Sequence, residues 1–220
     1  MYAYYQLNAL AAPRYYYFAD PSYWDYNKFH GQESLFRLIA RDLPATTVVL
    51  PKAFEENVRK IAPSIKVLAY NPKPEYPVYQ DGFEKKFVNA QAELPGVQTV
   101  THLALFHAIL LGYKSIYLIG VEMDDWQNVR GGIDGIKAAY FSHYYDNIKP
   151  DISEGTVFGA NNTMDYLSNY NYLRLLEDSH RAIKGFYNLA RVATNSGATV
   201  VNLSINSWLD CFPKASPSQI

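Results

Sequence analysis

The stretch LLGYKSIYLIGVEMDDW, residues 110–126, carries the pattern that decides the fold. It opens on the last residues of an amphipathic helical pattern, which Gly112 is placed to end as a C′ glycine. The apolar run SIYLI that follows shows no polar alternation, which is typical of a strand buried on both faces of a parallel sheet. Gly120 ends this run. Three acids follow at the predicted carboxyl end of the strand: Glu122, Asp124 and Asp125.

Strand-like and helix-like patterns alternate along the rest of the chain. Aromatic and β-branched runs predict strands over 14–21, 46–51, 65–74, 115–120 and 198–204. Apolar residues at helical spacing predict helices over 31–43, 52–62, 99–111 and 171–197, with a short final helix over 205–212. This alternation indicates an α/β fold with a Rossmann-like, mainly parallel sheet and helices on both faces. We expect a single domain over 1–220, with irregular excursions at about 71–97 and 121–168.

Composition and charge exclude several classes of function. The chain has 220 residues, of which 49% are hydrophobic and 19% charged, as in an ordinary globular protein. A net charge of −1 gives no global field toward nucleic acid, and no apolar run is long enough for a transmembrane segment. The single cysteine permits no intrachain disulfide framework. We therefore expect a protein that is cytoplasmic or peripheral at the inner membrane. The 20 tyrosines fit a cleft for a sugar or a base; the alternative is half-buried positions on sheet faces and at a homo-oligomer interface.

Polar residues after the predicted strands are the first candidates for a binding site. Ligands of open parallel sheets bind outside the carboxyl ends of the strands. The residues so placed include Asp20, Asn71, Glu122, Asn202 and Ser204. Three interpretations of Glu122 stay open: it accepts a hydrogen bond from a ribose hydroxyl, it holds a divalent metal together with Asp124, or it is solvated.

The segment SHYYDN, residues 142–147, carries the residues best suited to proton transfer. His143 lies in a polar and aromatic segment, where an imidazole takes a proton from a hydroxyl near neutral pH, and Asp146 is placed to orient it. Tyr144 and Tyr145 are neutral donors suited to phosphate oxygens, and hydrophobic anchoring of the loop is the alternative. The sequence contains no Gly-rich phosphate loop, no Cys/His zinc pattern and no G-x-S-x-G elbow, so no metal ligands are assigned beyond the open interpretation of Glu122 with Asp124.

Four segments together resemble one group of glycosyltransferases. LLGYKSIYLIGVEMD (110–124) and PRYYYFADPSYWD (13–25) are similar to segments of the bacterial lipooligosaccharide sialyltransferases and the related motility accessory factor glycosyltransferases. SHYYDN resembles the His-bearing loop of that group, and GATVVNLSINSWLDCFP (197–213) resembles its closing strand and helix. The archaeal 6-hydroxymethyl-dihydropterin diphosphokinases belong to the same superfamily. The resemblance covers most of the chain, from about residue 14 to residue 213, at low identity.

The resemblance implies a metal-independent glycosyltransferase of polysaccharide biosynthesis that requires no cofactor. Its donor would be a CMP-activated nonulosonic acid such as sialic acid, its acceptor a surface glycan, and the transfer would invert the anomeric centre. His143 would be the general base. The positions that the resemblance assigns to the nucleotide or its phosphate are Asp20, Thr99, Thr101, Glu122, Tyr144 and Tyr145; Asp124 and Asn202 join them through their place after predicted strands.

One departure from the group bears on activity. The group begins with a strand and a GNGPSL turn that cradles the nucleotide, and no such turn precedes PRYYYF here. We therefore expect either an N-terminally truncated chain or a lineage that has lost this element. Two other functions stay open: a diphosphokinase-like enzyme that acts on a pterin with Mg-ATP, and a non-catalytic protein that binds nucleotide or glycan.

Overall fold

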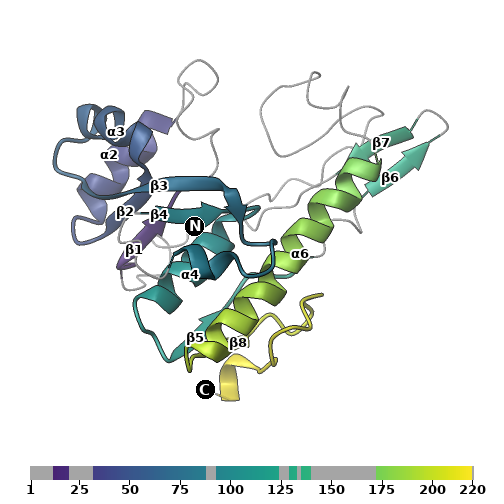
Figure 1. Cartoon of the computed structure of the whole chain (residues 1–220). Coiled ribbons are helices and arrows are strands. Elements are labelled where there is room, and N and C mark those ends of the chain that lie inside the picture. Colours follow the sequence, from purple (N-terminus) through teal and green to yellow (C-terminus); the bar gives the residue numbers. More distant parts are fainter. Residues whose placement is uncertain are drawn as a thin grey trace. The chain divides into compact units, whose positions relative to one another are not determined.

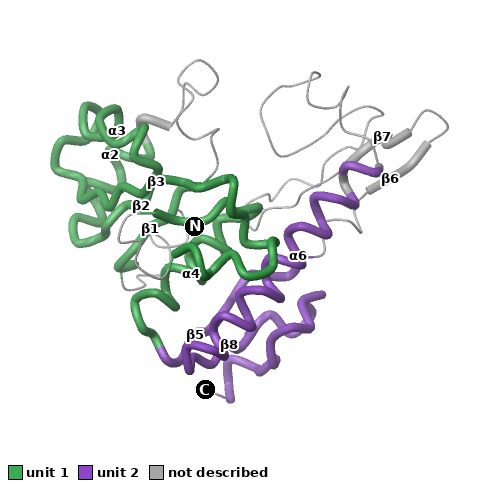
Figure 2. Tube along the Cα trace, viewed as in Figure 1, with its two compact units in different colours: residues 1–113 green, residues 114–220 purple. Residues whose placement is uncertain are grey.

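The structure is a computed structural model that describes residues 12–19, 32–87, 93–123, 129–132, 135–139 and 172–219. The chain divides into two compact units, residues 1–113 and 114–220, which Figure 2 colours separately. Each unit is described by itself below. The expectation of a single domain stays a prediction.

Unit 1 contains a four-stranded sheet in which every pair of neighbouring strands is parallel. The strands are β1 (Tyr15–Tyr17), β2 (Thr47–Pro51), β3 (Lys66–Pro77) and β4 (Glu93–Gly96), in the order β1-β2-β3-β4 (Figure 1). Tyr16 lies opposite Val48, which lies opposite Val67 on the next strand. The predicted α/β class with mainly parallel strands is confirmed.

Helices cover both faces of this sheet, as the side chains of Tyr17 in β1 and of Phe18, the next residue, show. The helical segments of the unit are α2 (Gln32–Asp42), η2 (Lys52–Phe54), α3 (Glu55–Ile61), η3 (Phe83–Lys86) and α4 (Val100–Leu110). Phe18 packs against Phe36 of α2 on one face, with ring centroids 5.1 Å apart. Tyr17 points to the opposite face, as strand geometry requires, and contacts His107 of α4.

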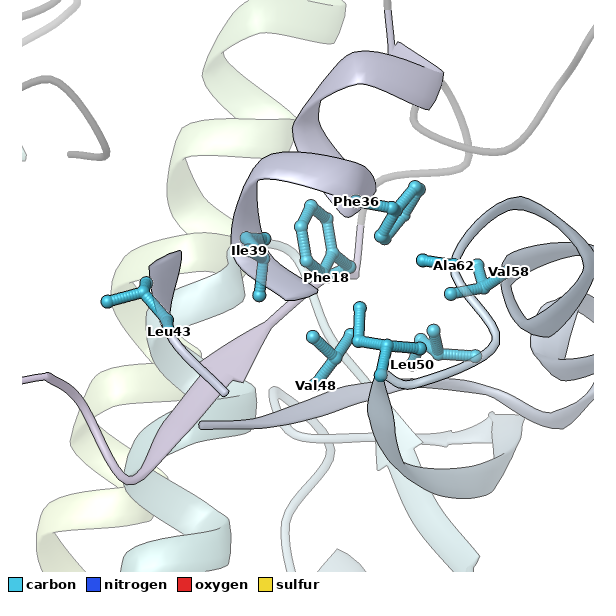
Figure 3. Packing of buried hydrophobic residues seen from close by; sticks show 9 residues of the cluster. Phe18, Phe36, Ile39, Leu43, Val48, Leu50, Val58 and Ala62 are labelled. Carbon is cyan, nitrogen blue, oxygen red and sulfur yellow. The ribbon is translucent and has the colours of Figure 1, made fainter. Parts of the chain in front are cut away.

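The core between the sheet and the first two helices is built from apolar side chains. Figure 3 shows Phe18, which directly follows β1, converging with Ile39 of α2 and Leu50 of β2. Val58 and Ala62 add the contribution of α3 and of the residue that follows it. Because β2 alternates, Val48 and Leu50 enter this core, while the equally buried Val49 faces the α4 side.

Helix α4 begins and ends where the sequence predicts. Thr99 is its N-cap, with extended backbone and a hydroxyl that accepts a hydrogen bond from the N–H of His102 at 3.3 Å. Gly112 has φ +81°, and the N–H groups of Gly112 and Tyr113 donate to the carbonyls of Ile109 and Ala108, at 3.0 and 3.2 Å. These two bonds form a Schellman C-cap.

Unit 2 contains a parallel strand pair and one long helix. The strands β5 (Ser115–Leu118) and β8 (Thr199–Asn202) pair in register from Ser115 opposite Thr199 to Leu118 opposite Asn202. Helix α6 (Tyr172–Asn195) buries Phe186 and Leu189, and a Schellman motif at Gly197, with φ +66°, ends it. Within the described ranges, no helix combines the length and the apolar character that a membrane crossing demands.

Three predicted irregular or helical segments have a different structure. The expected excursion over 71–97 contains the second half of β3 and all of β4. Prolines in these segments have no N–H donor and interrupt the alternation of apolar residues by which strands are predicted. The register between these strands shifts between Lys73 and Pro77. The expected excursion over 121–168 contains an antiparallel pair, β6 (Val129–Gly132) and β7 (Gly135–Ala139), so the glycine-rich segment that starts at Arg130 is partly strand.

The final helix expected over 205–212 is also wrong. These residues form turns, and a short 3-10 segment, η5 (Pro217–Gln219), comes later. Side chains here bond to the backbone in place of a helical ladder: the N–H of Ser204 donates to Asn202 Oδ1, and the N–H of Leu209 donates to Ser207 Oγ. Asn and Ser compete with helix formation in this way.

Candidate functional site at the strand ends of unit 2

The candidate site lies where β5 and β8 end side by side. Because the two strands are parallel, their carboxyl ends meet at one edge of unit 2. Pairing continues one step past β8, where the N–H of Leu203 donates to the carbonyl of Leu118 at 2.8 Å. Residues 119–123 leave β5 here and residues 203–208 leave β8, and the quoted acid Glu122 lies in the first of these two loops.

Asn202 joins the two loops from within the protein. Its side chain is fully buried; Oδ1 accepts from the N–H of Ser204 at 2.9 Å, and Nδ2 donates to the carbonyl of Val121 at 3.4 Å. The strand-end position therefore places the amide beside the loop that carries Glu122, and these contacts use both of its polar ends. The predicted contact of Asn202 with a nucleotide stays a prediction.

Two buried serines complete the connection. Ser204 Oγ accepts from the N–H of Val121 at 3.0 Å. Ser207 Oγ lies 2.6 Å from the carbonyl of Val121 and 3.2 Å from that of Glu122, and it accepts from the N–H of Leu209 at 3.1 Å. A donor or acceptor buried without a partner costs about 1–3 kcal/mol, so these bonds hold the loops in one arrangement. Ser207 was not predicted from the sequence. The signal that could have indicated it is a second serine three residues after Ser204, among apolar residues.

The loop after β5 is strained at the residue next to Glu122. Met123 has φ +55° and is the single non-glycine residue with positive φ among the described residues. A side chain in this conformation costs about 1–2 kcal/mol, and surrounding bonds must hold it there. Such a bond is present one residue earlier: the N–H of Trp208 donates to the carbonyl of Glu122 at 2.8 Å. The half-buried side chain of Glu122 is therefore attached to a backbone that is held in place.

Gly120 makes the turn out of β5 possible. Its φ is +71°, and a Cβ added there would meet nothing within 4 Å. The requirement for glycine is therefore conformational and not steric.

Thr99 and Thr101 belong to unit 1, at the amino end of α4. The Thr99 hydroxyl caps the helix, and Thr101 is half-buried in the first turn. Glu122 and Asn202 belong to unit 2. That all four contact one nucleotide stays a prediction.

The remaining predicted site residues lie outside the described residues. They are Asp20, Asp124, His143, Tyr144, Tyr145 and Asp146. Their roles as general base, orienting acid, phosphate donors and nucleotide contacts stay predictions. Within the described ranges, no group of three or more His, Cys, Asp or Glu side chains is placed to hold a metal.

A second polar cluster, in unit 1, joins β1 to α4. A 2.8 Å hydrogen bond connects the Tyr17 hydroxyl to Nδ1 of His107, and the Tyr15 ring packs edge-on against the same imidazole, with centroids 5.3 Å apart. Burial lowers the pKa of His107. Burial, followed by the neighbouring Tyr15 and Tyr113, raises the pKa of Tyr17. Both groups are therefore neutral at pH 7.

Comparison with known proteins does not assign the chain to a family. No family model matches it, and neither a curated protein nor a solved structure matches it.

Proposed function

We propose that the chain is a glycosyltransferase that moves a nonulosonic acid from a CMP donor to a glycan acceptor. The observation that carries the proposal is the strand-end site of unit 2. Two parallel strands end together there, and a half-buried carboxylate follows one of them on a loop that buried side chains hold in place. Parallel α/β sheets bind nucleotides at such ends, and an acid there accepts hydrogen bonds from ribose hydroxyls.

The chemistry assigned to this site is an inverting displacement. His143 takes the proton of the acceptor hydroxyl, whose oxygen forms a bond to the anomeric carbon. The bond from that carbon to the phosphate oxygen breaks, and CMP leaves with the bonding electron pair. Tyr144 and Tyr145 donate hydrogen bonds to the departing phosphate, while Asp146 orients the imidazole. No step requires a metal ion. The proposed partners are the donor and a surface glycan, and the proposed location is the cytoplasm or the inner face of the inner membrane.

A ligand panel tests the substrate class. Thermal unfolding of the full chain is followed with CMP, CMP-sialic acid, a UDP-sugar, Mg-ATP and a pterin. CMP and CMP-sialic acid are expected to raise the midpoint, because a ligand that binds the folded state alone stabilises it. Stabilisation by Mg-ATP and pterin without an effect of CMP would contradict the proposal and favour diphosphoryl transfer.

A second experiment tests the general base. His143→Ala is expected to keep CMP binding and to lower turnover with CMP-sialic acid by at least about 100-fold, the usual contribution of such a base. His180→Ala is the matched control, since this histidine lies exposed on α6. Near-wild-type turnover of His143→Ala would remove this residue from the mechanism.

A further inference from the structure

The side chain of Lys214 places an ammonium group at the strand ends of unit 2. The backbone on either side of this residue pairs with the last residue of β8: the N–H of Asn202 donates to the carbonyl of Pro213 at 2.9 Å, and the N–H of Ala215 donates to the carbonyl of Asn202 at 3.2 Å. From there the side chain reaches the loop after β8, where Nζ donates to the carbonyl of Ser207. The backbone and the charged end of Lys214 are thus both held at the carboxyl end of the strand pair.

The positive charge of Lys214 meets no carboxylate at ion-pair distance among the described residues. Its acceptor is a neutral carbonyl, whereas three other described lysines form ion pairs with glutamates: Lys52, Lys60 and Lys73. Asp210 lies in the same segment, but its carboxylate accepts a hydrogen bond from the hydroxyl of Tyr187 at 2.5 Å. Since an ammonium carries three N–H donors, Lys214 keeps its full charge and two donors for a further partner.

A cation held at this edge of the sheet suits a phosphate group. Ligands of parallel α/β sheets bind outside the carboxyl ends of the strands, and lysine binds phosphate as a compact point charge. Because the exposed side chain of Lys214 is already ordered in the free protein, binding does not carry the full entropy cost of fixing it. Glu122, in the loop after β5, carries the opposite charge. A nucleotide can use both groups, since its ribose hydroxyls donate hydrogen bonds and its phosphate is an anion.

We infer that Lys214 binds the phosphate of the nucleotide donor and stabilises the negative charge that develops on it as the leaving group departs. The inference rests on the proposed function, because it takes the phosphate of the CMP donor as the ligand. The bonds that form and break are those of the displacement described above, and Lys214 donates hydrogen bonds without transferring its proton. It supplies a positive charge that the proposed neutral donors, Tyr144 and Tyr145, do not carry.

Calorimetric titration of the full chain with CMP and with cytidine, which has the same base and ribose but no phosphate, tests the contact. Lys214→Met keeps most of the apolar stem and removes the charge. It is expected to bind CMP at least about tenfold more weakly than the wild type, and cytidine within about threefold of it. Lys214→Arg, which keeps the charge, is expected to bind CMP more tightly than Lys214→Met.

Lys114→Met is the matched control. Lys114 is also exposed and also donates to a backbone carbonyl, that of Ser196 at 2.8 Å, but it precedes the amino end of β5, away from the strand ends. Its loss is expected to leave CMP binding within about threefold of the wild type. Thermal unfolding shows whether each variant is folded. Should Lys214→Met fail to fold, Lys214→Gln, which keeps a neutral N–H donor for the Ser207 carbonyl, serves the same comparison.

The outcomes separate this inference from the proposed function. If Lys214→Met binds CMP as tightly as the wild type, the phosphate contact is wrong, and CMP binding still supports the transferase. Equal losses for CMP and cytidine would show that Lys214 only holds the loop in place, which also overturns the contact. If the wild type binds no CMP but binds AMP, GMP or UMP in a manner that Lys214→Met weakens, the phosphate contact stands and the CMP donor is wrong. If no nucleotide binds, or if Lys214→Met weakens only the binding of free N-acetylneuraminic acid, the phosphate contact is overturned.

Discussion

Tyr17→Phe should destabilise unit 1 by removing a single hydroxyl group. The substitution removes the hydroxyl that bonds to Nδ1 of His107 at 2.8 Å and leaves the ring contact in place. His107 is 9% exposed, so water does not readily replace the lost partner. A buried nitrogen without a partner costs about 1–3 kcal/mol, and we expect the free energy of unfolding to fall by that amount.

Urea denaturation at pH 7.5 measures the change, with stability obtained by linear extrapolation. Tyr15→Phe is the matched control: it removes a hydroxyl from the same face of the same strand, while the ring that packs on His107 stays. Because the ring contact is kept, Tyr15→Phe is expected to cost less unfolding free energy than Tyr17→Phe. Hydrogen exchange of the β1 and α4 peptides then assigns the loss to unit 1. A loss for Tyr17→Phe no larger than that of Tyr15→Phe would refute the reasoning.

Three further predictions concern pH, backbone conformation and the connection between the loops. Because burial lowers the pKa of His107 below the unfolded value of about 6.5, the unfolded state binds more protons. The contribution of His107 to the free energy of unfolding is then fully present above about pH 6.5 and is lost as the pH falls toward the folded pKa. His107→Gln should lack this pH dependence, and an unchanged pH profile of unfolding in the variant would contradict the prediction. Gly120→Ala should cost about 1–2 kcal/mol of unfolding free energy, because φ is +71° with open space around the added methyl; a neutral result would contradict the conformational explanation. Ser207→Ala removes the hydroxyl bonded to Val121 and should cost about 1–3 kcal/mol in urea unfolding, whereas the exposed Ser218→Ala should be neutral; equal effects would show that the connection is weak.

Much of the fold could be predicted because its local signals are strong. Thr99, Gly112 and Gly197 mark helix ends by conformational preferences that do not depend on distant contacts. The apolar run over 115–119 lacks alternation, and the structure places β5 in a parallel pair, as predicted. The prediction that this strand is buried on both faces is wrong, because Tyr117 is 48% exposed and Ile119, just after the strand, is 75% exposed. These signals were sufficient for the α/β class and for the position of Glu122 at a strand end.

The features that escaped prediction depend on partners far away in the chain. Strand β4 is recognisable only by its pairing with β3, because Pro95 has no backbone N–H to donate and interrupts the alternation of apolar residues. Residues 205–212 look helical until Ser207 is seen to bond to a carbonyl 86 residues away. The Tyr17–His107 bond spans 90 residues, and no spacing rule connects a tyrosine in a strand with a histidine in a later helix.

The central claim is that a cytidine nucleotide binds at the strand ends of unit 2, beside Glu122. Calorimetric titration of CMP into the wild type and into Glu122→Gln tests this directly, because the substitution keeps the shape of the side chain and removes its charge. We expect saturable one-to-one binding to the wild type and binding at least about tenfold weaker to the variant, which corresponds to about 1.4 kcal/mol, within the range of a hydrogen bond to a charged group. Equal affinities would remove Glu122 from the site, and absence of CMP binding to the wild type would contradict the proposal of a CMP-sugar transferase.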